Sequence, residues 1–279
     1  MKRNSPLIWA LIFVFFSGMF GIPRTVYAET VKIGGTGFAL GVIQLLATSF
    51  ENQYPEDKIK VFPSLGSSGG IKALLDGALD IGLSSRTLRE YEMGKGVSAL
   101  EIGRTPFVFF VNSNVNKDDL TFQELERIYN GQSLSWPGGT PIRLILRPKQ
   151  ETDMVVIRKI TPAMEQAVAF SFSREGMNVT ITDQENATVV ERTIGALGGG
   201  TLTQLLSENR QVKILSLKGV KPSVEGLVDG SYPWFKPFFL VTVDKTRPAV
   251  KRFKKFIASE IGSTILKNNG IMLLTSPKR

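Results

Sequence analysis

The stretch that decides the fold is Leu65-Gly66-Ser67-Ser68-Gly69-Gly70-Ile71-Lys72-Ala73-Leu74-Leu75. It follows a strand-like run over 58–63, and its own apolar residues then recur at the spacing of a helix. The Gly/Ser cluster therefore lies where a strand passes into a helix. A helix start leaves backbone N–H groups unpaired and carries partial positive charge, and glycine lets a ligand approach the backbone. The cluster predicts either an anion site or, more simply, a serine-capped helix after a tight turn.

Two further units of the same kind flank this stretch. A strand over 30–35 runs into Thr36-Gly37-Phe38 and a helix over 40–50, and a short strand over 78–83 ends in Ser84-Ser85-Arg86-Thr87. Consecutive strand–loop–helix units imply a parallel sheet, whose ligands bind at the carboxyl ends of the strands. Hydroxyls and a guanidinium at those ends suit an oxyanion. The alternatives are a plain turn at Thr36-Gly37-Phe38 and, for Arg86, an ion pair with Glu90 or Glu92.

The remainder of the chain continues the alternation of strands and helices. Thr121 and Glu124 have the spacing of a capping box at the start of a short helix over 122–129. Gly198-Gly199-Gly200 end a predicted strand over 194–200; because no Lys-Ser/Thr follows, we interpret them as close backbone packing or a turn rather than a phosphate loop. Further strands are predicted over 105–112, 142–146, 179–182, 212–217 and 238–243, and further helices over 154–159, 183–192, 248–259 and 262–268.

Histidine and cysteine are both absent from the 279 residues. Thiol nucleophiles, disulfides, thiolate metal sites and histidine-based catalysis are therefore excluded, and we expect no catalytic site, no metal and no cofactor. The net charge is +9, and it falls to +6 without the three basic residues of the segment 1–28, which holds no acid. The excess is spread out rather than gathered in a stripe, which argues against nucleic acid and suits a small anion.

Residues 1–28 have the pattern of a secretory signal peptide. Lys2 and Arg3 come first, an apolar run over 7–20 follows, and Val26-Tyr27-Ala28 provides small residues at the cleavage positions. We expect cleavage near Ala28, export to the periplasm, and no stable membrane insertion afterwards. Without a cysteine the product is not a lipoprotein. A retained anchor is the alternative, although the apolar run is short for a spanning helix.

Three passages of the mature chain resemble the phosphate-type periplasmic solute-binding proteins of ABC importers. The first is Gly66-Ser67-Ser68-Gly69-Gly70-Ile71-Lys72 with Asp80-Ile81-Gly82-Leu83-Ser84-Ser85-Arg86. The second runs from Phe107-Val108-Phe109-Phe110-Val111-Asn112 through Leu120-Thr121 and Ile128-Tyr129-Asn130-Gly131 to Trp136. The third is Tyr232-Pro233 followed by Pro237-Phe238-Phe239-Leu240-Val241. Their order and spacing together cover nearly all of the mature chain.

The resemblance implies an α/β fold of the type II periplasmic-binding class. It would have two lobes, each a mixed sheet flanked by helices, joined by a two-segment hinge near Pro106 and Pro237. The first lobe would hold residues 29–106 and 241–279, and the second would hold 107–240. Such lobes close on a ligand, and closure dehydrates an anion so that fixed N–H and O–H donors must replace its water.

The same resemblance implies a set of anion-binding residues, namely Thr36, Gly37, Phe38, Ser67, Ser68, Ser85, Arg86, Arg147 and Thr152. Arg147 falls on the family's arginine from the second lobe; its alternative is a salt bridge with Glu151 or Asp153. Ser85 falls where the best-known phosphate binders have an aspartate. The family has Ser-Gly-Thr at the helix start where this chain has Glu151-Thr152-Asp153, and two carboxylates there would repel a divalent anion unless they turn away.

We therefore predict a monomeric periplasmic protein that captures an inorganic oxyanion, phosphate first, for the permease of an ABC importer. The alternative is a sensory or interaction module on the same fold, which binds a partner protein or no oxyanion. An enzyme that uses Glu151 and Asp153 as acid and base is the third hypothesis and the one least supported by the residues.

Overall fold

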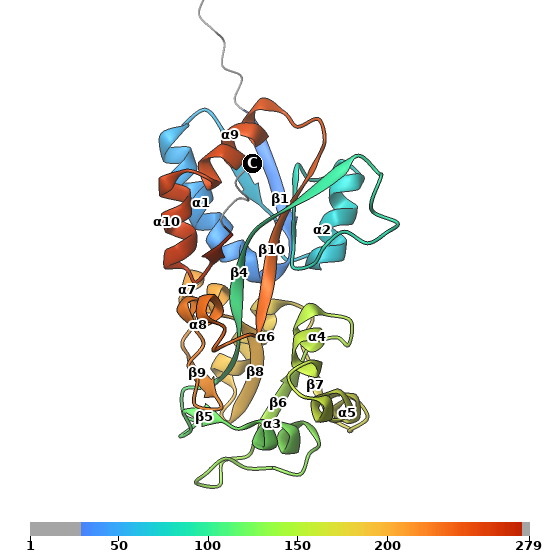
Figure 1. Cartoon of the computed structure of the whole chain (residues 1–279), viewed down its shortest axis with the longest axis vertical. Coiled ribbons are helices and arrows are strands. Elements are labelled where there is room, and N and C mark those ends of the chain that lie inside the picture. Colours follow the sequence, from blue (N-terminus) through green and yellow to red (C-terminus); the bar gives the residue numbers. More distant parts are fainter. Residues whose placement is uncertain (1–28, 275–279) are drawn as a thin grey trace, which may run out of the picture.

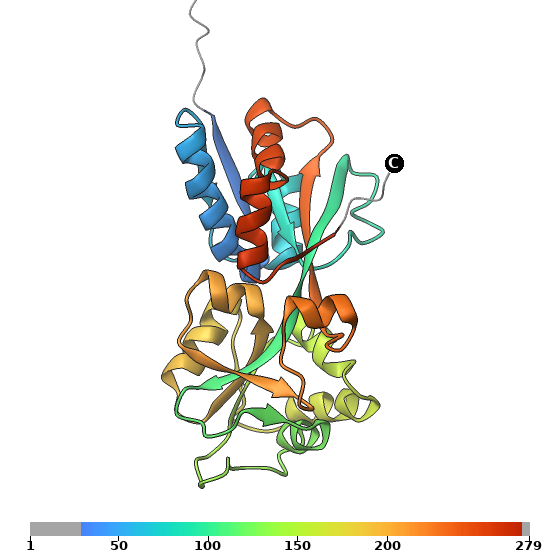
Figure 2. The same ribbon diagram turned by 60° about the vertical axis from the view of Figure 1, so that its left-hand side comes forward.

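The computed structural model describes residues 29–274, so the predicted signal peptide lies outside the described residues. The described chain forms two α/β lobes stacked along the long axis (Figure 1). Strands β4 (Val97–Asn112) and β10 (Phe235–Val243) run from one lobe into the other, and the turned view shows the same crossing (Figure 2). The two-lobed α/β fold with mixed sheets, predicted from the sequence, is confirmed. Within 29–274, no helix combines the length and apolarity needed to cross a membrane.

The sheet of the first lobe has the strand order β2-β1-β3-β10-β4. Strand β1 pairs in parallel with β2 and β3, as the repeated units predict, whereas β10 is antiparallel to β3 and β4. The neighbours Leu240 and Val241 of β10 point into different apolar cores on the two faces, as the period of a strand requires. Helices α1, α9 and α10 cover one core and α2 covers the other. The bounds are β1 Thr30–Gly35, η1 (a 3-10 turn) Gly37–Ala39, α1 Leu40–Gln53, β2 Lys58–Val61, α2 Gly66–Leu75, β3 Ile81–Ser84, α9 Pro248–Ile257, α10 Glu260–Asn268 and β11 Met272–Leu273.

The second lobe continues the same sheet through β8, β6 and β7; β9 also pairs with β4, and β5 pairs with β9. Its larger core lies under α3, α4 and α5, and a smaller core lies under α6 and α7. The predicted capping box is confirmed, since the Thr121 hydroxyl accepts a bond from Glu124 N and the Glu124 carboxylate accepts one from Thr121 N. The bounds are β5 Asp119–Leu120, α3 Phe122–Tyr129, β6 Arg143–Leu146, α4 Thr152–Arg158, α5 Pro162–Ser171, β7 Asn178–Val179, α6 Asp183–Arg192, β8 Ala196–Thr201, α7 Leu202–Ser207, β9 Val212–Leu217 and α8 Val224–Asp229.

Pro106 and Pro237 lie close together where β4 and β10 cross between the lobes. Pro106 is opposite Phe235, Pro237 is opposite Arg104, and the register shifts between Phe238 and Phe239. Proline provides no N–H to the ladder, and a register shift disrupts it locally, so both features weaken the pairing of β4 with β10 at this crossing. The predicted lobe boundaries fall inside these two strands, and both the boundaries and the hinge stay predictions.

Three local predictions differ from the structure. No side chain caps α2, so the serine-capped helix is wrong; Leu65 is the cap residue. The strand predicted over 179–182 ends at Val179, because Thr182 leaves it to cap α6 through its hydroxyl. The glycines expected at a strand exit lie inside β8 instead. Their close packing is confirmed, since a Cβ at Gly199 would lie 2.7 Å from Phe107 Cζ.

Candidate functional site

Three hydroxyl groups meet where the two lobes face each other. Ser67, in the first turn of α2, accepts a hydrogen bond from Ser85 N at 2.9 Å, and its Oγ lies 3.0 Å from Ser85 Oγ. Ser85, just after β3, lies with its Oγ 2.7 Å from Thr152 Oγ1, at the start of α4 in the second lobe. This hydroxyl chain joins the start of α2 and the end of β3 in the first lobe to the start of α4 in the second. It brings together three of the residues that the sequence predicts.

A cavity of about 80 Å³ lies beside the hydroxyl chain and is lined from both lobes. We call it the interlobe cavity; its lining residues are Leu65, Gly66, Ser67, Ser68, Arg86, Arg89, Gln150, Glu151 and Thr152. The uncapped start of α2 forms one wall, so unpaired backbone N–H groups and partial positive charge lie at this wall. Hydroxyls, a helix start and two arginines together are the donor set that an oxyanion requires.

Arg86 has an ion-pair partner at the edge of this cavity. Its guanidinium donates to both oxygens of Glu92 at 2.8 Å, and Nη2 also donates to Ser68 Oγ at 2.9 Å. The bond from Arg86 holds the pKa of Glu92 below its usual range, although burial opposes this. The ion pair expected as the alternative is therefore present, and it also fixes the guanidinium at the cavity wall.

The first loop, Thr36-Gly37-Phe38, lies against a carboxylate of the second lobe instead of the hydroxyl chain. Its residues are buried, and Thr36 N donates to Leu83 O at 2.9 Å. A Cβ at Gly37 would collide with Asp183 Oδ2, so a larger residue here would require that carboxylate to move. Gln184 also reaches this loop and donates from Nε2 to Gly37 O at 2.8 Å.

Arg147 lies in a buried group of four charges that we call the ion cluster: Arg147, Asp153, Asp183 and Lys236. Arg147 Nε donates to Asp153 Oδ2 at 3.3 Å, Nη2 lies 3.6 Å from Asp183 Oδ2, and Nη1 donates to Thr180 O at 2.9 Å. Lys236 Nζ donates to Asp153 Oδ1 at 2.6 Å and lies 3.6 Å from Asp183 Oδ1. The salt bridge with Asp153, expected as the alternative for Arg147, is present, and Glu151 is not its partner.

The four side chains of the ion cluster are only 1 to 6% exposed, so their charges interact strongly. Burial opposes ionisation of Asp153, but the charges of Lys236 and Arg147 outweigh it and hold its pKa below the usual range. For Lys236, burial is likewise outweighed by Asp153 and Asp183, which raise its pKa. Asp153 and Lys236 are therefore charged at neutral pH, and the formal charges of the four side chains sum to zero.

At Glu151, beside the interlobe cavity, the nearby positive charges do not outweigh the effect of burial on the pKa. Burial raises its pKa, and the negative charges of Asp153 and Asp183 add to this, against the opposing effect of Arg147 and Lys236. A Cβ at Gly66 would lie 3.8 Å from Glu151 Oε1, so this carboxylate faces the start of α2. The second lobe thus directs acidic groups toward the positions in the first lobe that suit an anion.

Sequence reasoning missed Asp183, Gln184 and Lys236. Asp183 and Gln184 begin a helix that the sequence predicts at the correct position, but their approach to Gly37 depends on how the lobes meet. Lys236 lies in a strand next to a proline and follows no polar motif. Residues 29–274 hold no group of three or more His, Cys, Asp or Glu side chains arranged to bind a metal ion.

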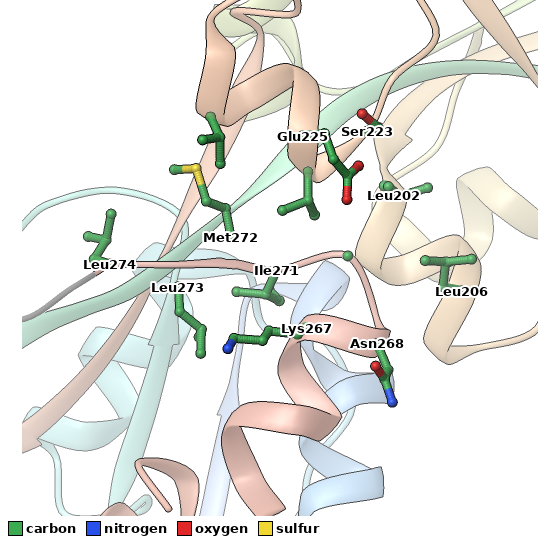
Figure 3. Close-up of a pocket in the computed structure, with 13 residues that line it drawn as sticks. Leu202, Leu206, Ser223, Glu225, Lys267, Asn268, Ile271, Met272, Leu273 and Leu274 are labelled. Carbon is green, nitrogen blue, oxygen red and sulfur yellow. The ribbon is translucent and has the colours of Figure 1, made fainter. Parts of the chain in front are cut away.

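A larger hollow of about 710 Å³ lies elsewhere at the junction of the lobes (Figure 3). Leu202 and Leu206 of α7 lie on one side of it and the segment 270–274 lies on the other, and Glu225 and Lys267 also line it. Its wall is mostly apolar, so it does not suit a small oxyanion.

A family model for the PBP superfamily domain matches residues 24–260. The chain belongs to this superfamily. Among its relatives, the phosphate-binding protein PstS of Borreliella burgdorferi is 24% identical, with 88% of this chain and 90% of the relative covered. PstS of Bacillus subtilis is 26% identical, with 89% and 82% covered. The resemblance predicted from the sequence is confirmed.

Solved structures of similar proteins have the same fold. A substrate-binding protein from Clostridium perfringens, solved with bound phosphate, matches with a TM-score of 0.73 and 22% identity over 88% of this chain and all of that one. An ABC-type phosphate transport receptor from Vibrio cholerae matches with a TM-score of 0.60 and 20% identity over 88% of this chain and all of that one. At these identities the likeness shows the fold, and the ligand of this chain must be argued from its own residues.

Proposed function

We propose that this protein is an exported solute-binding protein that captures an inorganic oxyanion, phosphate first, between its lobes and delivers it to the permease of an ABC importer. The observation that carries the proposal is the hydroxyl chain from Ser67 through Ser85 to Thr152, which crosses from one lobe to the other beside a cavity with two arginines. Relatives named as phosphate-binding proteins, aligned over most of their length, support the same solute class. The protein acts as a monomer and performs no catalysis.

In this proposal the oxyanion binds in the interlobe cavity. The start of α2 and the hydroxyls of Ser67 and Ser68 supply donors from the first lobe, and Thr152 supplies one from the second. The Ser85 hydroxyl does not line the cavity but lies within hydrogen-bond distance of Ser67 and Thr152. Arg86, held by Glu92, adds positive charge without having to be ordered on binding. A ligand that bonds both Ser67 and Thr152 links the lobes, so binding energy favours the closed form.

Calorimetry on the mature protein tests this function. Phosphate, sulfate, molybdate and a small phosphoester are titrated at neutral pH, and absence of heat with every oxyanion would refute the proposal. A hydrogen bond to a charged group contributes about 1.5–3 kcal/mol, so Thr152→Val should weaken binding about 10- to 100-fold. The matched control is Thr48→Val, because the Thr48 hydroxyl bonds only Gln44 O of its own helix, and it should leave affinity unchanged.

A second candidate is a sensory or interaction module that binds a partner protein or no oxyanion. The ion cluster favours it, because Arg147 and Lys236 already have carboxylate partners. The two functions differ in the expected partner. Phosphate uptake by a permease that depends on this protein supports transport. Co-purification with a sensor kinase, together with no calorimetric heat on addition of an anion, supports the second candidate.

A further inference from the structure

Two carboxylates of the second lobe fill the inner side of the interface between the lobes. Asp183 Oδ2 lies against Gly37, at the start of the turn η1 in the first lobe. Asp153 Oδ1 accepts a bond from Lys236 Nζ at 2.6 Å, where β10 crosses between the lobes. Lys236 Nζ in turn lies 5.1 Å from the centre of the Phe38 ring in the same loop. The loop predicted to hold an anion thus already faces acidic side chains.

Within the ion cluster, both cations, Arg147 and Lys236, already have oxygen atoms as partners. Each of the three guanidinium nitrogens of Arg147 faces an oxygen of Asp153, Asp183 or Thr180. Lys236 faces one oxygen of each aspartate. Within the ion cluster, Asp183 Oδ1 is buried without a hydrogen bond, and it lies 3.6 Å from Lys236 Nζ. Two positive and two negative charges therefore balance inside the protein.

The geometry points to Asp153 and Asp183 as a built-in counter-anion that occupies the inner end of the site and confines solute recognition to the interlobe cavity. This inference rests on the proposed function for the identity of the solute class. An oxyanion placed at Arg147 would meet two carboxylates at close range and would have to displace them, since like charges repel strongly where water is excluded. Asp153 and Asp183 are thus specificity-determining residues, which keep Arg147 and Lys236 from the solute.

Removing one carboxylate should create an anion site at the inner end. In Asp183→Asn the cluster carries one net positive charge, and inorganic phosphate or sulfate can restore the balance. We expect phosphate affinity, measured by calorimetry at pH 7, to rise at least tenfold above that of the wild type. Asp153→Asn should behave in the same way. Thermal unfolding with and without phosphate gives a second readout, because a ligand that binds the native state raises its melting temperature.

The matched control is Asp57→Asn. Asp57 is fully buried and bonds Arg252 through both carboxylate oxygens at 2.7 Å, but it lies outside the two sites described above. Its replacement should not raise phosphate affinity. A charge-neutral double variant, Asp153→Asn with Lys236→Met, avoids an unpaired charge and so keeps the protein folded. It should bind phosphate as the wild type does, because the inner end does not contact the solute.

The outcomes separate this inference from the proposed function. If the wild type binds no oxyanion while Asp183→Asn does, the proposed function fails and the counter-anion stands. If the wild type binds phosphate and both single variants or the double variant bind it at least tenfold more weakly, the inference is overturned and the function stands. Single variants that neither bind phosphate nor gain melting temperature from it also overturn the inference, because a created site would produce both effects.

Discussion

Replacing Lys236 by methionine tests whether the ion cluster stabilises the fold. The change keeps a long apolar side chain but removes an ammonium that lies 2.6 Å from Asp153 Oδ1 and 3.6 Å from Asp183 Oδ1. At an effective dielectric constant of about 20, these two attractions amount to roughly 6 and 5 kcal/mol. Most of that gain is offset by the cost of burying the charge and by repulsion from Arg147, so the net loss on removing one partner is about 3–5 kcal/mol.

The assay is thermal and urea unfolding of the mature protein, followed by circular dichroism. For a chain of this size each kcal/mol shifts the melting temperature by about 2–4 °C, so Lys236→Met should lower it by about 6–20 °C. The matched control is Lys72→Met, whose i,i+4 partner Asp76 lies on the surface; there the two side chains are 76% and 56% exposed. Such a pair contributes at most about 0.5 kcal/mol.

The double variant with Asp153→Asn completes the test. Because it removes both members of the 2.6 Å pair, it should recover part of the stability that Lys236→Met loses, and the coupling measures the pair itself. If Lys236→Met unfolds at the same temperature as Lys72→Met, the four charges do not stabilise the fold, and the reasoning from burial and balance is refuted.

Two further predictions concern other parts of the molecule. Burial raises the pKa of Glu151, so the ionised carboxylate destabilises the folded state at pH values above the unfolded-state pKa of about 4.3. Glu151→Gln should therefore raise the melting temperature at pH 7 but leave it unchanged below about pH 4. A variant that is less stable than the wild type at pH 7 would contradict this. Gly199→Ala should lower the free energy of unfolding in urea by about 1–3 kcal/mol, because the added Cβ would lie 2.7 Å from the Cζ atom of the buried Phe107. Adding Phe107→Leu should relieve the crowding. Equal stability of the single variant and the wild type would show that the strand shifts freely.

Local patterns in the sequence were enough to predict several strands and helix starts of the fold. The strand–loop–helix units predict parallel pairing of β1, β2 and β3, and Thr121 with Glu124 predicts the start of α3, because these features depend on neighbours within a few residues. The capping signal Thr161-Pro162 marks the start of α5 in the same way, although no element was predicted there. Order and spacing of three passages were enough to predict the family.

Only the tertiary structure decided what the predicted anion-binding residues contact. Arg147 and Asp153 are six positions apart, and the sequence offered their salt bridge as an alternative, but Asp183 and Lys236 join them from distant elements. Gly37 was predicted as an anion-binding residue or as part of a plain turn, and only the meeting of the lobes shows that it makes room for Asp183. The charge that a buried arginine can offer a ligand depends on every charge packed around it. Those neighbours come from α4, α6 and β10, whose approach is set by long-range packing that no local pattern encodes.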